Sequence, residues 1–298
     1  MSIHEPVLTS EVLRLLEPSR GGLFVDCTVG LGGHARALLE AGASRVLGLD
    51  RDPDALSAAR ESLAAYADRV ELVHADYRTL DAVLDARGIR VVDGALADLG
   101  VSSLQLDTDA RGFSFRRDGP LDMRMDRTTG PTAADLVNGA PEADLADAIW
   151  RYGEERFSRR IARRIVEARA REPIASTGAL AGIVRRAVPV RGYQRIDPAT
   201  RTFQALRIWV NRELDGLDEF LRTAVGRLRA GARLVVITFH SLEDRIVKHT
   251  LRALAAGPGA LVTVLTRRPV VPDEAEVERN PRARSAKLRS AERLPAAA

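Results

Sequence analysis

A short glycine-rich segment carries the residue types best suited to bind a small ligand. It reads Asp26-Cys27-Thr28-Val29-Gly30-Leu31-Gly32-Gly33-His34 and follows the apolar run Leu23-Phe24-Val25. Glycines in such a segment tolerate positive φ and let the backbone approach a ligand closely. In an open α/β sheet, loops of this kind lie at the carboxyl ends of the strands, where ligands bind. The segment therefore predicts a ligand-binding turn between a strand and a helix.

Acidic residues end the next apolar runs as well. Asp50 ends the run that begins at Arg45, 20 residues after Gly30, and Asp76 and Asp98 end two further runs. A carboxylate in the position of Asp50 can accept hydrogen bonds from both ribose hydroxyls of a nucleoside. Any one of these acids could be a solvated loop carboxylate, but an acid near the end of four consecutive strands favours a nucleoside site.

The loop pattern discriminates between nucleoside cofactors. A dinucleotide site uses G-x-G-x-x-G and places the pyrophosphate at a helix N-terminus. This chain has G-x-G-G-H, preceded by Asp26, whose charge would repel a pyrophosphate. The same charge suits the sulfonium and ammonium groups of S-adenosylmethionine. We therefore expect S-adenosylmethionine as the cofactor, and a nicotinamide oxidoreductase is a more distant alternative.

The elements that must position these residues alternate between strands and helices. Strands are predicted at residues 23–26, 45–50, 70–76, 91–99, 232–239, 261–265 and 286–294, and the first helices at 34–39 and 53–66. This alternation indicates βαβ units around a parallel, doubly wound sheet. Residues 104–200 contain no convincing strand, and residues 140–187 read as helices, one of them capped by Ser158. The predicted organisation is an α/β domain over 1–105 and 205–298, with a helical domain inserted at 106–204.

Several long blocks of the sequence resemble one family, the bacterial 16S ribosomal RNA (cytosine-N4) methyltransferases known as RsmH or MraW. The blocks run in order along almost the whole chain: His4–Leu8, Asp26–His34, Asp98–Ser103, Arg111–Phe115, Asp118–Met125, Tyr152–Arg156, Pro198–Ala205, Phe239–Arg245 and Asn280–Arg284. Strings of this length are far more specific than a glycine loop. Leu104 stands where the family commonly has proline, a departure that puts little in doubt.

The resemblance implies a class I, Rossmann-like methyltransferase domain interrupted by a helical substrate-recognition domain. The implied reaction is N4-methylation of a cytidine in the decoding region of 16S ribosomal RNA. The implied partner is that RNA or the small ribosomal subunit. The residues that match cofactor contacts of the family are Gly32, Gly33, His34, Asp50, Tyr77, Asp98 and Gln105. Tyr77 replaces a frequent phenylalanine and keeps an aromatic face for adenine.

Asp98 is also the candidate catalytic residue. The N4 lone pair of cytosine is delocalised into the ring, so the amine must be aligned with the methyl group and its hydrogens held by acceptors. Many amino-methyltransferases use a D/N/S-P-P-aromatic motif at this strand end. Here the segment reads Asp98-Leu99-Gly100-Val101, which keeps the acid and lacks the prolines and the aromatic residue. Asp98 could therefore serve the cofactor alone.

The inserted region is strongly basic. Residues 151–212 contain 15 arginines and five acids, whereas the whole chain has a net charge of only +4. Arg159, Arg160, Arg163 and Arg164 form two adjacent pairs one helical turn apart, so they share a helix face. We interpret this face as a phosphate-binding surface, although it could be a plain solvated face. Phe113 and Phe115 could stack on bases or anchor their loop to the core.

The remaining composition restricts where and how the protein works. The chain has no apolar run long enough to span a membrane and no secretory signal at its N-terminus, and its single cysteine, Cys27, forms no internal disulfide. These features predict a cytoplasmic protein. Its five histidines show no metal-ligand spacing, so no metal is expected. A homodimer is possible. The rival functions are another DNA or RNA amino-methyltransferase and an inactive ribosome-assembly protein that retains this fold.

Overall fold

The chain folds into two compact units. The computed structural model describes residues 6–189 and 196–295. Unit 1 consists of Met1–Gly100 and Leu214–Ala298, and unit 2 of Val101–Glu213. The predicted junctions differ from these by five and nine residues, and the predicted junction at 204/205 would divide the continuous helix α10 (Ala199–Asn211). The helix explains the difference, since its backbone hydrogen bonds keep its two halves in one unit.

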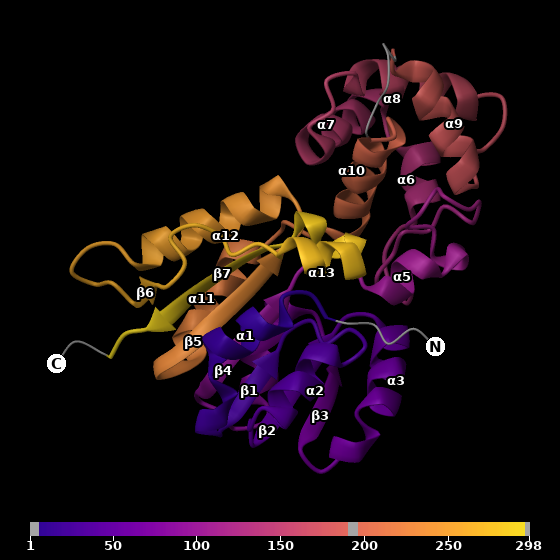
Figure 1. Ribbon diagram of the computed structural model, residues 1–298. Coiled ribbons are helices and arrows are strands. Elements are labelled where there is room, and N and C mark those ends of the chain that lie inside the picture. Colours follow the sequence, from indigo (N-terminus) through magenta and orange to yellow (C-terminus); the bar gives the residue numbers. More distant parts are fainter. Residues whose placement is uncertain (1–5, 190–195, 296–298) are drawn as a thin grey trace. The chain divides into compact units, whose positions relative to one another are not determined.

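Unit 1 is built on a seven-stranded sheet in the order β3-β2-β1-β4-β5-β7-β6 (Figure 1). The strands are β1 Leu23–Asp26, β2 Arg45–Asp50, β3 Val70–His74, β4 Val92–Asp98, β5 Leu228–Thr238, β6 Val262–Val264 and β7 Lys287–Arg293. Strands β1 to β5 are parallel to one another, and β7 is antiparallel to both β5 and β6. This confirms the predicted doubly wound α/β fold.

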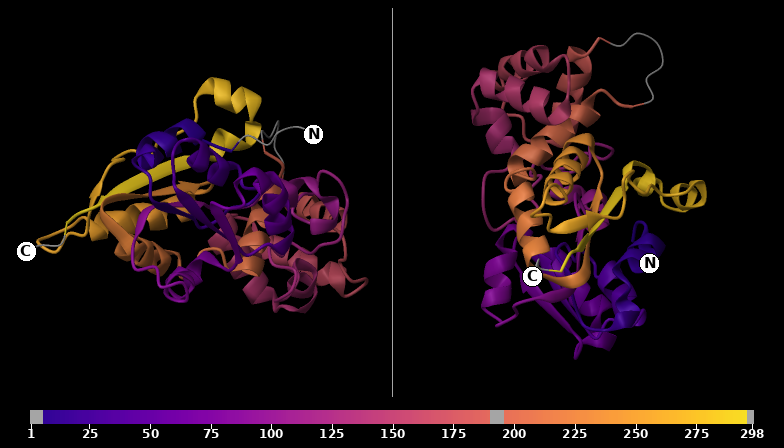
Figure 2. Two further views of the ribbon diagram at one scale, coloured as in Figure 1. Left: turned by 90° about the horizontal axis from the view of Figure 1, so that it is seen from below. Right: turned by 90° about the vertical axis from the view of Figure 1, so that its left-hand side faces the viewer.

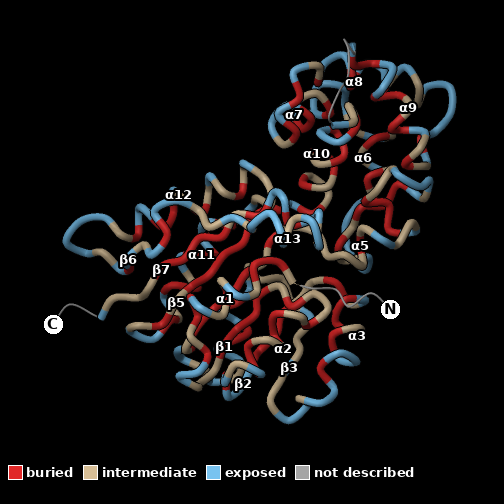
Figure 3. Tube along the Cα trace, viewed as in Figure 1, coloured by how far each residue is buried: buried red, intermediate tan, exposed pale blue. Residues whose placement is uncertain are grey.

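The sheet has an apolar core on each face, because successive residues of a strand point to opposite sides. Phe24, Val46 and Leu96 belong to the core on one face, and Val25 and Leu47 to the core on the other. Helices α1 (Thr9–Leu16), α2 (Gly33–Glu40) and α3 (Pro53–Ser62) contribute to the first core. Helices α4 (Leu80–Asp85), α11 (Leu217–Arg227) and α12 (Ser241–Leu254) contribute to the second. Figure 3 shows the central strands as the buried layer.

The strand ends bring three predicted site residues to one edge of the sheet. Asp26 pairs in register with Gly48 of β2, which ends two residues later at Asp50. On the other side of β1 lies β4, which ends at Asp98. These three strands are adjacent and parallel, so their carboxyl ends lie together. The sheet topology therefore places Asp26, Asp50 and Asp98 beside the glycine turn.

Unit 2 is helical. Its helices are α5 Ser103–Asp107, α6 Ala133–Gly139, α7 Glu142–Gly153, α8 Ser158–Arg169, α9 Thr177–Ala187 and α10. Within its described residues there is no strand, only an isolated bridge between Pro120 and Ser176. Ser158 was predicted to cap a helix, and this is wrong: it is the first residue of α8, and the Glu155 carboxylate accepts the Phe157 amide at 2.9 Å instead.

The loop before α6 is held down by internal hydrogen bonds. The buried Arg111 guanidinium donates to the carbonyls of Arg124 and Met125. The Asn211 side chain accepts from the Met125 amide and donates to the Met123 carbonyl, both at 2.7 Å. The loop is thus anchored to α10 within unit 2.

The two loop phenylalanines anchor it further. Phe113 is buried, and the ring of Phe115 packs edge-on against Phe203 at 4.6 Å. Of the two alternatives for these aromatic residues, the structure supports anchoring.

None of the helices within the described ranges has the length and apolar composition needed to cross a membrane.

Candidate functional site

The glycine turn is attached to both neighbouring strands. The Cys27 amide donates to the Leu96 carbonyl of β4, and the Val29 amide to the Leu49 carbonyl of β2, each at 2.8 Å. Gly32 then precedes α2 with a φ of +84°, and a Cβ there would lie 2.8 Å from a Leu63 methyl carbon. Both the conformation and the space at this position require glycine. The turn is therefore a fixed backbone feature at the N-terminus of α2.

Asp50 ties β2 to this turn. Its two carboxylate oxygens accept the amides of Gly30, at 2.8 Å, and of Asp52, at 2.9 Å. Burial raises the pKa of Asp50 to about 6, although both hydrogen bonds act in the opposite direction. A carboxylate oxygen has a second lone-pair direction. Asp50 can thus accept the two backbone amides and still accept a hydrogen bond from a hydroxyl group of a ligand.

Asp98 is fixed from the other side. Its backbone amide donates to the Thr28 hydroxyl at 2.7 Å. One carboxylate oxygen, Oδ2, lies 3.5 Å from Nε2 of His34. The other, Oδ1, is buried and has no hydrogen-bond partner within the described part of the chain. Asp98 therefore presents a free acceptor at the turn.

Asp26 is the most deeply buried of the three acids, with 1% of its surface exposed. Its Oδ1 accepts the Thr28 amide at 3.2 Å, but its Oδ2 finds no partner among the described residues. Burial raises the pKa of Asp26 to about 7, against the stabilising charge of His34. Near neutral pH, this carboxyl is therefore balanced between its neutral and ionised forms.

His34, the second residue of α2, completes the cluster. Burial by itself lowers the pKa of His34, but the nearby Asp98 and Asp26 carboxylates outweigh it and raise the pKa. Neither ring nitrogen makes a hydrogen bond of good geometry within the described residues. Buried polar groups are normally paired. Unpartnered atoms on Asp26, His34 and Asp98 at one turn indicate a ligand that supplies hydrogen-bond donors and positive charge.

The remaining predicted contacts lie elsewhere. Tyr77 follows β3, the strand beyond β2, and one side of its ring packs against Phe220 at 4.7 Å. Gln105 belongs to unit 2, where its side chain accepts the Ser102 amide at 3.0 Å in a helix capping box. The structure brings together Gly32, Gly33, His34, Asp50 and Asp98. The cofactor contacts assigned to Tyr77 and Gln105 remain predictions.

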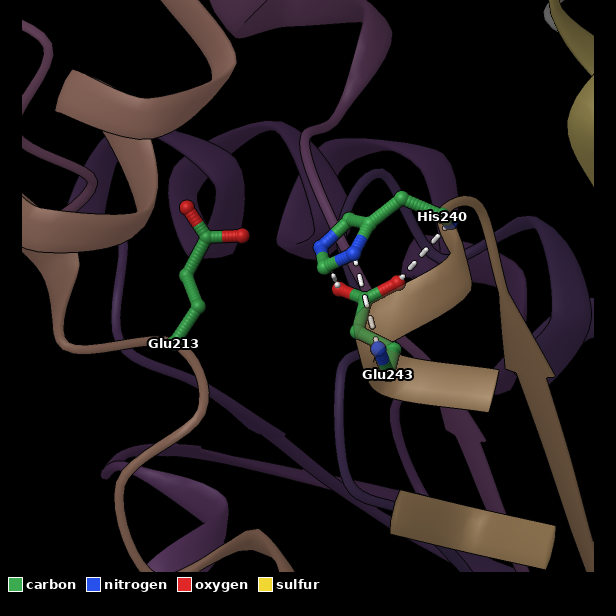
Figure 4. Close-up of side chains that lie close together, drawn as sticks. All are labelled: Glu213, His240 and Glu243. Carbon is green, nitrogen blue, oxygen red and sulfur yellow. Dashed lines mark hydrogen bonds and ion pairs between the residues drawn. The ribbon is translucent and has the colours of Figure 1, made fainter. Parts of the chain in front are cut away.

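His240, two residues after the end of β5, has an internal role. Its Nε2 lies 3.1 Å from the Glu243 carboxylate (Figure 4), and that carboxylate also accepts the Phe239 amide at 3.0 Å. His240 is the N-cap of α12, and its ring faces Glu243. Glu213, drawn in the same figure, belongs to unit 2 and pairs with Arg207 at 2.8 Å. These contacts account for His240 as a capping residue.

Two residues of this site were missed by sequence reasoning. The Thr28 hydroxyl connects the turn to β4, and the Glu276 carboxylate, far away in sequence, accepts the Leu8 amide near α2. Thr28 lies inside the glycine segment, shortly after a strand-end acid. This position was the signal that could have identified it as a site residue. No local pattern identifies Glu276, because its partner is 268 residues away.

In a doubly wound sheet a ligand binds at the carboxyl ends of the strands, and a glycine turn with acids at three adjacent strand ends fits a class I methyltransferase domain. Comparison with known proteins agrees. Residues 1–294 match the MraW methylase family. A relative from Geotalea uraniireducens (strain Rf4), Ribosomal RNA small subunit methyltransferase H, is 51% identical over 98% of both chains.

Two further relatives carry the same name. The one from Methylobacterium sp. (strain 4-46) is 53% identical over 99% of this chain and 92% of its own, and the one from Synechococcus elongatus is 54% identical over 98% and 95%. The chain therefore belongs to the MraW methylase family. Family membership confirms the expected methyltransferase activity with S-adenosylmethionine as the methyl donor.

Proposed function

We propose that this protein transfers a methyl group from S-adenosylmethionine to the exocyclic N4 of a cytidine in the decoding region of 16S ribosomal RNA. The observation that carries the RNA substrate is the identity of about half of all residues, over nearly the full length, to proteins named as methyltransferases of small-subunit ribosomal RNA. The choice of N4 within that RNA rests on the resemblance and on the acceptor chemistry of the site.

The chemistry of the turn supports this cofactor. S-adenosylmethionine carries a methyl group on a positively charged sulfonium, together with an ammonium group and two ribose hydroxyls. The unpartnered oxygens of Asp26 and Asp98 offer negative charge and hydrogen-bond acceptors for such a cation. Asp50 is the acceptor proposed for the ribose hydroxyls, and Gly32 and Gly33 let the backbone approach the ligand. The donor set therefore fits the cofactor.

Asp98 is the proposed catalytic residue. Its Oδ1 can accept an N4 hydrogen of the target cytosine, which orients the amine and draws its hydrogen out of the ring plane. The hydrogen bond from the Asp98 backbone amide to the Thr28 hydroxyl fixes the strand end, and His34 lies against Oδ2, so the free oxygen has a defined direction. The residue thus contributes alignment and acceptance of a hydrogen bond, the two requirements of a poorly nucleophilic amine.

Unit 2 is proposed to bind the RNA. Helix α8 buries Ile161, Ala162 and Ile165 and exposes the four predicted arginines on its outer side. Arg163 and Arg164 pair with Glu167, at 3.6 and 2.7 Å, whereas Arg159 and Arg160 form no ion pair within the described residues. Arg159 and Arg160 are therefore the better candidates for phosphate contacts.

The decisive experiment is methyl transfer to defined substrates. Purified protein is incubated with labelled S-adenosylmethionine and either protein-free small-subunit RNA or assembled small subunits, and the product is mapped by mass spectrometry. We expect one methyl group on N4 of a decoding-region cytidine. Methylation at carbon or of DNA alone would overturn the assignment. Cofactor binding without transfer to either substrate would favour an assembly factor.

A further inference from the structure

The N-terminal segment Pro6–Leu8 lies directly on the glycine turn. A Cβ placed on Gly33 would come within 2.6 Å of Cγ of Pro6, so the proline ring fills the space beside Gly33. Val7 and Leu8 are buried, and Leu8 adopts a left-handed φ of +54° immediately before α1. The segment is thus a packed part of the wall around the turn.

A residue from the opposite end of the chain fastens this segment. Glu276, in helix α13 (Glu274–Arg279), accepts the Leu8 backbone amide at 2.7 Å. Leu8 is the N-cap of α1 and makes no side-chain cap. A carboxylate at a helix N-terminus satisfies a backbone donor and interacts favourably with the helix dipole. Both views of Figure 2 place the yellow α13 beside the indigo N-terminal segment, in agreement with this contact.

Helix α13 holds Glu276 in place for this contact. The Asp273 side chain caps the helix by accepting the Glu276 amide, and the Asn280 amide donates to the Glu276 carbonyl, both at 2.7 Å. Glu276 is partly buried, whereas Glu278 on the same helix is exposed. The acceptor is therefore held by contacts of the fold, unlike the exposed Glu278.

The charge of Glu276 also reaches the site. It is one of the carboxylates that raise the pKa of His34, after the nearer Asp98 and Asp26. Glu276 therefore influences the turn by two routes, one mechanical through Leu8 and Pro6, and one electrostatic through His34.

We infer that Glu276 is a positioning residue for the cofactor site: it holds Pro6–Leu8 against Gly33 and so fixes the turn and His34 in their binding geometry. This inference rests on the proposed location of the S-adenosylmethionine site at that turn. By this inference the C-terminal helix α13 helps to position the cofactor site, although α13 supplies no atom to the glycine turn itself.

Three variants of Glu276 separate the two routes. Glu276→Gln keeps an acceptor for Leu8 and loses the charge. Glu276→Asp keeps the charge and shortens the reach, and Glu276→Ala removes both. The matched control is Glu278→Ala, an exposed glutamate of the same helix. Two quantities are measured: the hydrogen exchange of the Leu8 amide, and the dissociation constant for S-adenosylmethionine by calorimetry. Neither measurement needs RNA.

We expect Glu276→Ala and Glu276→Asp to lose Leu8 protection and to weaken cofactor binding about tenfold or more, the scale of one lost hydrogen bond to a charged group. Glu276→Gln should retain protection and most of the affinity, and Glu278→Ala should match the wild type. Rescue by glutamine would not occur if the residue acted only by its charge.

Two results would overturn the inference. Unchanged affinity in Glu276→Asp with lost protection of Leu8 would show that the segment does not position the site. Unchanged protection in Glu276→Asp and Glu276→Ala would disprove the contact. Asp50→Ala, measured in parallel, tests the site itself: if it also binds the cofactor normally, the proposed location fails, and that failure is distinct from a failure of Glu276 alone.

Discussion

At the scale of single residues, the site depends on acids that the fold buries without complete pairing. Such groups are costly in a folded protein unless a ligand completes their hydrogen bonds. Asp98 is the clearest example, because its amide and one oxygen are engaged while Oδ1 is buried and unpartnered. The same oxygen could serve the cofactor or the target amine, and a substitution can separate these roles.

Asp98→Asn should lower the rate of methyl transfer about 100-fold, the scale of losing one well-placed hydrogen-bonding group. Asparagine keeps one neutral acceptor oxygen but loses the negative charge, so it holds an N4 hydrogen more weakly than the carboxylate does. The rate is measured in single turnovers at saturating S-adenosylmethionine, and the dissociation constant of the cofactor is measured separately. Asp218→Asn, an exposed acid of α11, is the control. Normal turnover with weaker cofactor binding would assign Asp98 to the cofactor alone.

At the scale of elements, the strands were the easiest part to predict. The bounds of β1 and β2 agree with the prediction, because short apolar runs that end in an acid and precede a glycine or proline are well delimited. Strand β5 begins at Leu228 rather than Ala232, and its pairing with β4 is irregular near Gly231, which has a φ of +79°. The sequence predicted a helix in the region of α8 but not its N-terminus, where Ser158 is the first helical residue and Glu155 accepts the Phe157 amide.

Contacts between residues far apart in the chain could not be predicted from the sequence. The loop before α6 contains arginine and phenylalanine residues whose pattern suits both base stacking and anchoring. Only the fold shows that Arg111 is buried and bonded to loop carbonyls. In the same way, no spacing rule connects Glu276 with Leu8. Patterns report which residues share an element, whereas pairings between distant segments depend on how the elements pack.

Helix α8 carries an element-scale prediction. Reversing Arg159 and Arg160 to glutamate should weaken RNA binding at low salt and reduce the salt slope of log K by about 2, one for each lost phosphate contact. Affinity for S-adenosylmethionine should be unchanged. The control is the double reversal of Arg222 and Arg252, two exposed arginines of α11 and α12 in unit 1. Equal binding by both double variants across a salt titration would contradict a specific role for α8.

At the scale of the whole molecule, the buried Asp26 couples stability to pH. Its pKa is about 7 in the folded chain and 3.8 in an unfolded one. Below about pH 3 the side chain is mostly protonated in both states. Between about pH 4 and 7 the unfolded state releases the proton first, so the free energy of unfolding falls as the pH rises. The full penalty, at most about 4 kcal/mol, is present above pH 7.

The variant Asp26→Asn removes this titration. Relative to the wild type, it should gain stability progressively from pH 4 to 8, as measured by urea unfolding without cofactor, while Asp218→Asn should run parallel to the wild type. S-adenosylmethionine should reverse the trend, because its positive charge favours ionised Asp26 and neutral His34. Cofactor affinity of the wild type should therefore rise with pH through 7, whereas Asp26→Asn should bind more weakly and respond less to pH. If the two proteins show the same pH dependence in both measurements, Asp26 is not the group that couples folding to cofactor binding.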